Sequence, residues 1–217
     1  LQTPHGTFII NGVERVIVSQ LARSFGVFFT MAELRAKRLF GAKVIPARGA
    51  WVEFETDTDG VVYVRIDRKR KFPVTALLRV LGARFDRDMY SLFSSNSHGK
   101  AVIESTLAKD SAKTLDDAYI EIHKKLRDGD PASVENARDF INSIFSPERY
   151  DLSPVGRHRF NQRFKRVISE EELEKRTLSL DDVVTIVSHI ISLNNTPGSE
   201  PDDIDHLGFR RVRYVGE

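Results

Sequence analysis

Two neighbouring stretches in the first third of the chain alternate apolar and polar residues with a period of two. They are "AKVIPARGAWVEFET" (42–56) and "GVVYVRID" (60–67), and the turn-forming residues "DTDG" join them. A period of two places successive side chains on opposite faces of an extended strand, and the residues between the stretches favour a tight reversal. The pattern therefore predicts a β-hairpin, with Pro46 and Arg48-Gly49 interrupting its first strand.

The two ends of the chain also predict strands. "GTFIING" ends in Asn11-Gly12, a dipeptide typical of two-residue hairpin turns, and "VERVIVSQL" (13–21) continues on its far side. "RSFGVFFT" follows with Gly26 as an expected bend, and "RRVRYV" (210–215) alternates again near the end of the chain.

Four segments between these ends carry helical signals. They span residues 73–82, 115–129, 134–145 and 179–195. The expected N-caps of the last three are Thr114 or Asp116, Ser133, and Ser179. A strand-rich N-terminal part and C-terminal end around a helix-rich middle predict an α+β fold, in which the two termini are candidates for pairing with each other.

The composition is that of a globular domain and excludes several kinds of site. Hydrophobic residues make up 41% of the 217 residues, and 33 Lys and Arg against 31 Asp and Glu leave a net charge of only +2. Any contact with nucleic acid must therefore rest on local patches. The chain has no cysteine, which excludes disulfides and cysteine-based zinc sites. It also shows no secretory signal and no membrane-spanning apolar run, which predicts a cytoplasmic protein.

Cations and one aromatic residue lie together near the predicted hairpin. Five of the seven residues in 65–71 are Lys or Arg, which suits either a phosphate-contacting patch or a solvated strand end. Trp51 is the only tryptophan. A lone tryptophan usually belongs to the core, whereas an exposed one beside arginines can stack on a base. Both alternatives stay open for each feature.

The segment "DDIDHLGFRRVR" (202–213) has two interpretations. The acidic cluster 202–205 and His206 are residue types that bind hard cations. The three arginines of 210–213 compete for the same carboxylates, which favours ion pairs over a metal site. The histidines are scattered, and neither a nucleotide-binding glycine motif nor a serine nucleophile motif occurs. The sequence therefore predicts no active site within the chain.

Six stretches occur in an order that resembles one protein family. They are "GTFIINGVERVIVSQLARSFGVFF", "VIPARGAWVEFE", "VRIDRKRKFPVTALLRVLG", "LRDGDP", "RYDLSPVGRHRFN" and "DDIDHLGFRRVRYVGE". Together they resemble the beta subunit of bacterial DNA-directed RNA polymerase, over nearly the whole chain. Residues 1–22 resemble protrusion-side strands of that much larger subunit, 23–205 its lobe domain (domain 2) and 206–217 the strand that returns to the protrusion. The resemblance implies an excised fragment rather than a complete natural protein.

The resemblance also implies a noncatalytic part of a nucleotidyltransferase. In the family, the lobe forms one wall of the downstream DNA cleft, and a pocket at its junction with the protrusion receives an unpaired nontemplate-strand base. The pocket positions of the family fall here on Arg23, Trp51, Asp67, Ile204, Asp205 and Arg210. The candidate phosphate contacts are Arg68, Lys69, Arg70 and Lys71, and Val18 falls on a strand that borders the rifamycin pocket.

Partners and cofactors follow from the same resemblance. The implied partners are the downstream duplex and nontemplate strand of DNA, the rest of beta, the beta-prime, alpha and omega subunits, and the sigma factor, with no membrane. The catalytic magnesium of the family is bound by the beta-prime subunit, so no cofactor is expected in this chain. The implied location is the cytoplasm, in association with the nucleoid.

Three positions depart from the family's pattern. Phe25 stands where the family usually has proline, and Phe209 stands where it usually has asparagine. Ala108 occupies the position of an additional pocket arginine, with Lys109 as a candidate substitute. These departures bear on the fine specificity of the pocket.

Two other functions fit the residues. One is a stand-alone metal-dependent nuclease built on the acidic cluster 202–205. The other is a protein-docking module, whose basic stretch 65–71 binds an acidic partner such as the N-terminal region of sigma. Stoichiometric metal binding with DNA cleavage distinguishes the nuclease, and substitutions of Trp51 and Asp205 in a polymerase separate DNA-binding from protein-binding roles.

Overall fold

The computed structural model describes residues 2–18, 20–34, 36–94, 97–128, 133–202 and 207–210. The chain divides into two compact units, one of residues 25–202 and the other of residues 1–24 with 203–217. The larger unit contains a five-stranded sheet and the helices of the described residues, whereas the smaller contains two pairs of strands. This combination of sheets and helices confirms the predicted α+β class.

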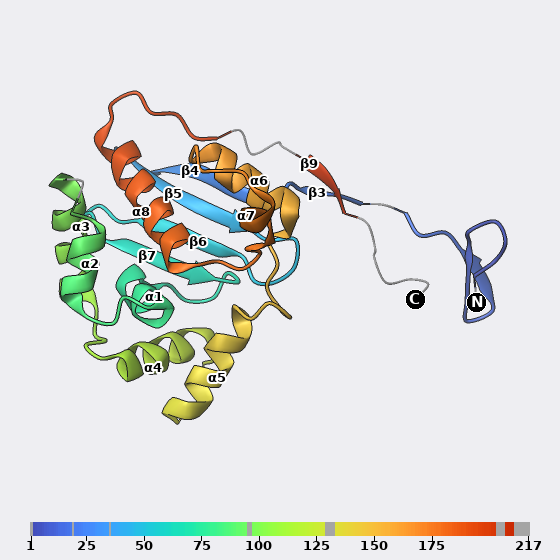
Figure 1. Ribbon diagram of the computed structural model, residues 1–217, viewed down its shortest axis with the longest axis horizontal. Helices are drawn as coiled ribbons and strands as arrows, with labels where there is room; N and C mark the ends of the chain where they lie inside the picture. Colours follow the sequence, from blue (N-terminus) through green and yellow to red (C-terminus); the bar gives the residue numbers. More distant parts are fainter. Residues whose placement is uncertain are drawn as a thin grey trace. The chain divides into compact units, whose positions relative to one another are not determined.

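The sheet of the larger unit is an antiparallel meander, in which each strand pairs with the next along the chain (Figure 1). Its strands, in spatial order, are β4 (Gly26–Leu34), β5 (Lys37–Ile45), β6 (Val52–Thr56), β7 (Val62–Ile66) and β8 (Phe72–Pro73). The hairpin predicted within 42–67 is confirmed for β6 and β7, which pair from Val52↔Ile66 to Thr56↔Val62. The predicted first strand, 42–56, is wrong in its bounds, because residues 42–45 belong to β5, which pairs with β6. Strand β5 ends just before Pro46, which has no N–H to donate to a neighbouring strand.

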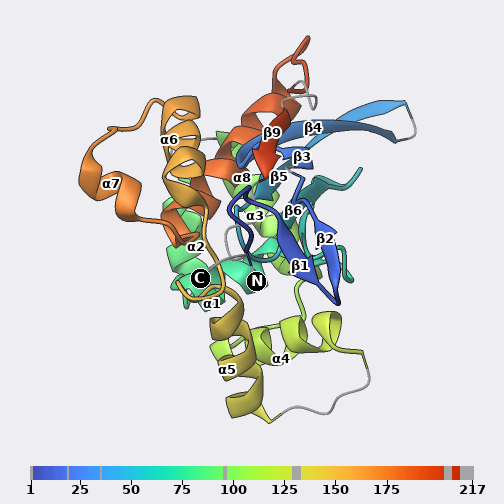
Figure 2. The same ribbon diagram turned by 90° about the vertical axis from the view of Figure 1, so that its right-hand side faces the viewer.

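The hairpin of β4 and β5 has no counterpart among the hairpins predicted from the sequence. It pairs from Gly26↔Ile45 to Leu34↔Lys37, and Figure 2 shows it extending beyond the rest of the sheet. Residues 32–34 and 36–38 at its end are exposed. Because neither face of the strands is covered there, no row of apolar side chains has to be buried. The sequence therefore lacks the alternation of apolar and polar residues that indicates a half-buried strand.

Caps and turns mark the beginnings of several helices. The helices are α1 (Val74–Leu81), α2 (Asp86–Leu92), α3 (Ser97–Lys109), α4 (Leu115–Leu126), α5 (Val134–Ile144), α6 (Ser153–Arg163), α7 (Glu170–Glu174) and α8 (Leu180–Asn195). The hydroxyls of Thr114, Ser133 and Ser179 each accept a hydrogen bond from a first-turn N–H of α4, α5 and α8. The predicted caps are therefore confirmed, with Thr114 rather than Asp116 serving α4.

Of the other helices, only α1 was predicted from the sequence. Helix α1 follows Pro73 and ends at Gly82 as predicted, whereas α2, α3, α6 and α7 have no counterpart among the predicted helices. Gly129, the expected end of α4, lies outside the described residues. None of the helices within the described ranges is both long and apolar enough to cross a lipid bilayer.

Helices cover one face of the five-stranded sheet. Helix α8 contacts β5 and α1 contacts β7, while α1 and α8 also contact each other. The strand residues on this face are fully buried, as Phe29, Val44, Phe54 and Val64 illustrate. Burial of this apolar face supplies the main driving force for folding.

Charged residues occupy the opposite face of the same strands, as the period of two requires. Lys43 on β5 pairs with Glu53 on β6 at 3.2 Å, and Arg65 on β7 pairs with Glu55 on β6 at 3.1 Å. Arg65, one of the five cations in 65–71, is therefore engaged within the sheet.

The smaller unit contains two antiparallel pairs of strands. Strands β1 (Phe8–Ile10) and β2 (Val13–Arg15) form the hairpin that Asn11-Gly12 predicts, and both turn residues have positive φ angles, 52° and 77°. Strand β3 (Gln20–Arg23) pairs with β9 (Leu207–Arg210). The expected pairing of the two chain ends is confirmed for these strands. Beyond Arg210, the strand predicted at 210–215 lies outside the described residues.

A close approach of two strands at Gly41 gives a test of the sheet. A Cβ atom added at Gly41 would lie 2.3 Å from the carbonyl oxygen of Phe54 on β6. Replacing Gly41 by alanine is expected to lower the free energy of unfolding by about 1–3 kcal/mol, because backbone atoms of two strands must separate. Urea denaturation measures the change. Thr30→Ala, at the residue paired with Gly41 on β4, is the control with the smaller expected effect, and a Gly41→Ala protein as stable as the wild type would contradict the close approach.

Candidate nucleic-acid interface

The hairpin of β6 and β7 brings Trp51 and Asp67 together. Trp51 immediately precedes β6 and Asp67 immediately follows β7. Because Val52 pairs with Ile66, the next residues outward along the hairpin are Trp51 and Asp67. The N–H of Asp67 donates to the carbonyl oxygen of Trp51 over 2.8 Å. Two of the predicted pocket residues therefore lie side by side at one end of this hairpin.

Asp67 and Arg68 are the two central residues of a tight turn that runs from Ile66 to Lys69. Asp67 and Arg68 both have left-handed backbone conformations, with φ of 50° and 59°, and the N–H of Lys69 donates to the carbonyl oxygen of Ile66 over 3.0 Å. A left-handed conformation costs a non-glycine residue about 1–2 kcal/mol. The surrounding hydrogen bonds must offset this cost, so the turn is held in one conformation.

The cations of this turn make different contacts. The guanidinium carbon of Arg68 lies 5.6 Å from the ring centroid of Trp51, and the ammonium of Lys71 lies 4.6 Å from that of Tyr63. Arg70 pairs with Asp128 at 2.9 Å, and both side chains are well exposed, so the pair contributes little stability. The four candidate phosphate contacts from Arg68 to Lys71 are all exposed. The side chain of Trp51 is half-buried, which is intermediate between the core position and the exposed position that the sequence left open.

The loop that leads into Trp51 is anchored at its other end. The N–H groups of Ala47 and Arg48 both donate to the carbonyl oxygen of Asp151, and the N–H of Asp151 donates back to the carbonyl oxygen of Arg48. Gly49 has φ of 116°, and an added Cβ atom would lie 2.9 Å from the ring of Tyr150. Only glycine fits this approach, so the loop before Trp51 packs directly on the segment before α6.

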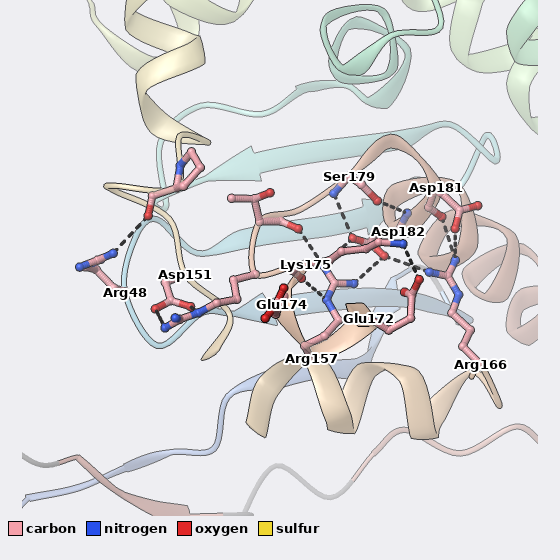
Figure 3. A pocket seen from close by; sticks show the side chains of 13 residues that line it. Arg48, Asp151, Arg157, Arg166, Glu172, Glu174, Lys175, Ser179, Asp181 and Asp182 are labelled. Atoms are coloured by element: carbon pink, nitrogen blue, oxygen red, sulfur yellow. Dashed lines mark hydrogen bonds and ion pairs between the residues drawn. The ribbon is translucent and has the colours of Figure 1, made fainter. Parts of the chain in front are cut away.

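Beside this anchor lies a cavity of about 530 Å³ lined by charged side chains (Figure 3). Figure 3 shows Arg157 from α6 and Arg166 both directed at Asp182 of α8. Arg157 bonds both oxygens of Asp182, at 2.8 and 2.9 Å, and Arg166 bonds one of them at 3.0 Å. Arg157 and Asp182 are almost completely buried. Arg166 also pairs with Asp181 at 2.6 Å. The two arginines and two aspartates neutralise one another, which indicates a structural network rather than a site poised to bind or react with a ligand.

Asp151 lines the same cavity, and its carboxylate has a lowered pKa. Burial of its side chain acts to raise its pKa, but the hydrogen bonds that it accepts from Arg176 and from the N–H of Ser153 outweigh burial and hold the pKa below the ordinary value of 3.8. Asp151 is therefore ionised at neutral pH and ties the loop before Trp51 to the residues that flank α6 and α7. Sequence reasoning missed this network, because its partners are far apart in the chain.

The remaining predicted pocket residues belong to the smaller unit or lie outside the described residues. Arg23 ends β3 and is exposed. Val18 is 72% exposed and lies between β2 and β3, so the single strand predicted over 13–21 is wrong. Arg210 ends β9, whose pairing with β3 puts it opposite Gln20, so Arg23 and Arg210 lie at opposite ends of this two-stranded ladder. Ile204 and Asp205 lie outside the described residues.

Asp202 has a structural role. Its carboxylate accepts a hydrogen bond from the N–H of Phe29 at 2.7 Å and pairs with Arg163 at 2.7 Å, while its own N–H donates to the carbonyl oxygen of Phe29. The ion-pair interpretation is confirmed for Asp202, although its partner is Arg163 rather than an arginine of 210–213. Within the part of the chain that the structure describes, no group of three potential metal ligands gathers.

Comparison with protein-family models shows which family the chain belongs to. The model of RNA polymerase Rpb2, domain 2, matches residues 25–213. The chain belongs to this family. The DNA-directed RNA polymerase beta subunits of two strains of Dehalococcoides mccartyi are each 46% identical to it over 223 aligned residues. The alignment covers the whole chain but only 17% of each relative, so the chain spans about a sixth of the length of these curated relatives.

Membership of the Rpb2 domain 2 family confirms the resemblance that the six ordered stretches indicated. The matched region of this Rpb2 domain contains the end of the hairpin with Trp51 and Asp67, together with the whole larger unit. Arg23 and Val18 precede the matched region.

The lowered pKa of Asp151 predicts a pH-dependent contribution to stability. Replacing Asp151 by asparagine is expected to lower the free energy of unfolding by about 1–3 kcal/mol at neutral pH, through the loss of charge-assisted hydrogen bonds. Since the native pKa is below the unfolded one, this contribution is present above the unfolded value and is lost as pH falls through the native value. Urea unfolding of both proteins from neutral pH down to about pH 2.5 measures the difference, which should shrink in acid.

Asp116→Asn provides the matched control, because Asp116 pairs with Arg138 at the surface, where both side chains are about half exposed. It should change stability by less than about 1 kcal/mol at any of these pH values. A difference between wild type and Asp151→Asn that stays constant from neutral to acid pH would contradict the ionised, hydrogen-bonded state of Asp151.

Proposed function

We propose that this chain is the lobe, with flanking strands of the protrusion, of the beta subunit of a bacterial DNA-directed RNA polymerase. In this proposal residues 1–22 and 206–217 belong to the protrusion side and residues 23–205 to the lobe. The chain is noncatalytic, forms part of the downstream DNA cleft and receives an unpaired nontemplate-strand base. The observation that carries the proposal is the pairing of half-buried Trp51 with Asp67 beside four exposed cations.

The chemistry of this end of the hairpin suits an extruded base. Stacking of a base on an aromatic side chain contributes about 1–3 kcal/mol, and it requires a partly exposed, fixed ring such as Trp51. The carboxylate of Asp67 can accept a hydrogen bond from an exocyclic amine. The exposed cations from Arg68 to Lys71 add favourable interactions with phosphates, which weaken as salt rises.

The motif positions of the family add Arg23, Ile204, Asp205 and Arg210 to the residues proposed to bind the base. Asp205 accepts hydrogen bonds from the guanine edge, Ile204 adds apolar contact, and Arg23 and Arg210 position the carboxylate or bind phosphate. Val18 borders the rifamycin pocket of the assembled enzyme. These assignments rest on the motif positions of the family.

The proposed partners are those of a polymerase. They are DNA, the rest of beta, the beta-prime, alpha and omega subunits, and sigma, within the nucleoid of the cytoplasm. The nucleotidyl transfer and its magnesium, held by beta-prime, belong to the assembled enzyme. The alternative of a nuclease built on 202–205 is weakened, because Asp202 is already engaged by Phe29 and Arg163.

The proposal is tested in a polymerase whose beta subunit carries this chain. Trp51→Ala and Asp67→Ala are each expected to shorten the lifetime of the promoter complex, by about five- to hundredfold for the loss of a base stack at Trp51. The decay of preformed complexes after addition of a competitor measures the lifetime.

Lys37→Ala is the control for this experiment. It removes an exposed cation at the end of β5 opposite to the loop that leads into Trp51, and should leave the lifetime unchanged. If Trp51→Ala and Asp67→Ala also left the lifetime and the nontemplate-strand contacts unchanged, the pocket would be wrongly assigned.

A further inference from the structure

We infer that Arg68 is a positioning residue for Trp51: its guanidinium covers one face of the indole, so that Trp51 offers a single face to a base. The contact between Arg68 and Trp51 stands on the geometry alone. Its consequence for DNA rests on the function proposed above, but assigns Arg68 to the ring of Trp51 and leaves Lys69, Arg70 and Lys71 as the phosphate contacts. Neither step requires a residue of the smaller unit.

Arg68 differs from the neighbouring arginines in its choice of partner. Arg65 pairs with Glu55, and Arg70 pairs with Asp128. Among the described residues, no carboxylate lies within ion-pairing distance of Arg68, and its guanidinium carbon instead lies over the Trp51 ring at 5.6 Å. A cation within about 6 Å of an aromatic centroid is attracted by the negative face of the ring.

The backbone fixes this contact. Asp67 bonds the carbonyl oxygen of Trp51 through its N–H, and Arg68 is the next residue, held at φ of 59° by a turn that Lys69 closes. One hydrogen bond, from Asp67 to Trp51, and the peptide bond between Asp67 and Arg68 therefore link the backbone of Arg68 to that of Trp51. A side chain placed in this way needs little further ordering to cover the ring.

Two consequences follow for a nontemplate base. A bare indole can stack on both faces, whereas one covered by guanidinium can accept a base on the other face alone, giving the order base, indole, guanidinium. The planar, delocalised guanidinium is suited to this stacked position, whereas the ammonium of lysine is a compact point charge. Arg68 thereby sets the number of bases that Trp51 binds and the side from which the base enters.

The contact is tested without DNA, because Trp51 is the only tryptophan in the chain and so the only source of tryptophan fluorescence. Arg68→Ala should shift the emission to longer wavelength and increase quenching by acrylamide, since a face of the indole becomes open to water. Arg70→Ala removes the same charge two residues away and should leave both signals unchanged. Arg68→Lys should fall between wild type and Arg68→Ala.

Circular dichroism of each variant separates a local change from unfolding. If Arg68→Ala retained the wild-type spectrum of secondary structure together with wild-type emission and quenching, the contact would be absent and the inference would be overturned. An equal change in Arg70→Ala would also overturn it, because the effect would then be one of charge alone.

A double-mutant cycle tests the consequence for DNA in the assembled polymerase. Arg68→Ala should shorten the promoter-complex lifetime about two- to fivefold, the fold-change of a cation–π contact at an exposed site. In a Trp51→Ala background the same substitution should have almost no effect, because Arg68 acts through the ring. Additive effects would show that Arg68 acts independently, as a phosphate contact, and would contradict this inference while leaving the base pocket in place.

Together, the two experiments distinguish an absent contact between Arg68 and Trp51 from a wrongly assigned base pocket. A fluorescence change on Arg68→Ala, combined with no effect of Trp51→Ala on the promoter complex, would reject the proposed base pocket and retain the contact between Arg68 and Trp51. The reverse combination would retain the base pocket and reject the positioning role.

Discussion

The larger unit depends on one buried ion pair, between Arg157 of α6 and Asp182 of α8. Removing two charges from water costs several kcal/mol for each ion, and the cost is offset only where the remaining donors and acceptors are satisfied. Arg157 meets this condition, because its other N–H groups bond the carbonyl oxygens of Lys175 and Thr177. Asp182 also accepts from the N–H of Ser179 as part of the capping box of α8. One pair thus joins two helices and the segment between them.

This framework supports the end of the hairpin that carries Trp51. The loop at 46–51 is bonded to Asp151 on one side, and the backbone of Trp51 is bonded to Asp67 on the other. Asp151 lines the same cavity as the buried pair and is held there by Arg176. A stacking residue works best when its ring is already oriented, because the entropy of ordering is then not lost on binding. The left-handed turn at Asp67 and Arg68 is the strained feature that such support makes tolerable.

Short-range patterns predicted the hairpins β1–β2 and β6–β7 and three helix caps, but missed the exposed hairpin β4–β5 and the long-range pairs. Alternation and turn residues are sufficient for β6 and β7, and Ser179 marks the start of α8 by itself. Helix α6 escapes prediction because its buried face includes Arg157 and Asn161, which interrupt an apolar stripe. The run of cations at 65–71 shows the same limit, since charge alone cannot tell that Arg65 pairs across strands and Arg68 covers a ring. The ordered motifs carried the family relationship, which periodicity could not supply.

The base pocket proposed above requires that an unpaired nontemplate base stack on Trp51 in the assembled enzyme. The most direct measurement is a cryo-electron microscopy structure of a polymerase carrying this chain, bound to DNA with a premelted bubble. Such a structure should show a base against the indole of Trp51, on the face away from Arg68, with Asp67 beside it. An indole with no base on it, and a nontemplate strand that runs along another surface, would contradict the proposed stacking.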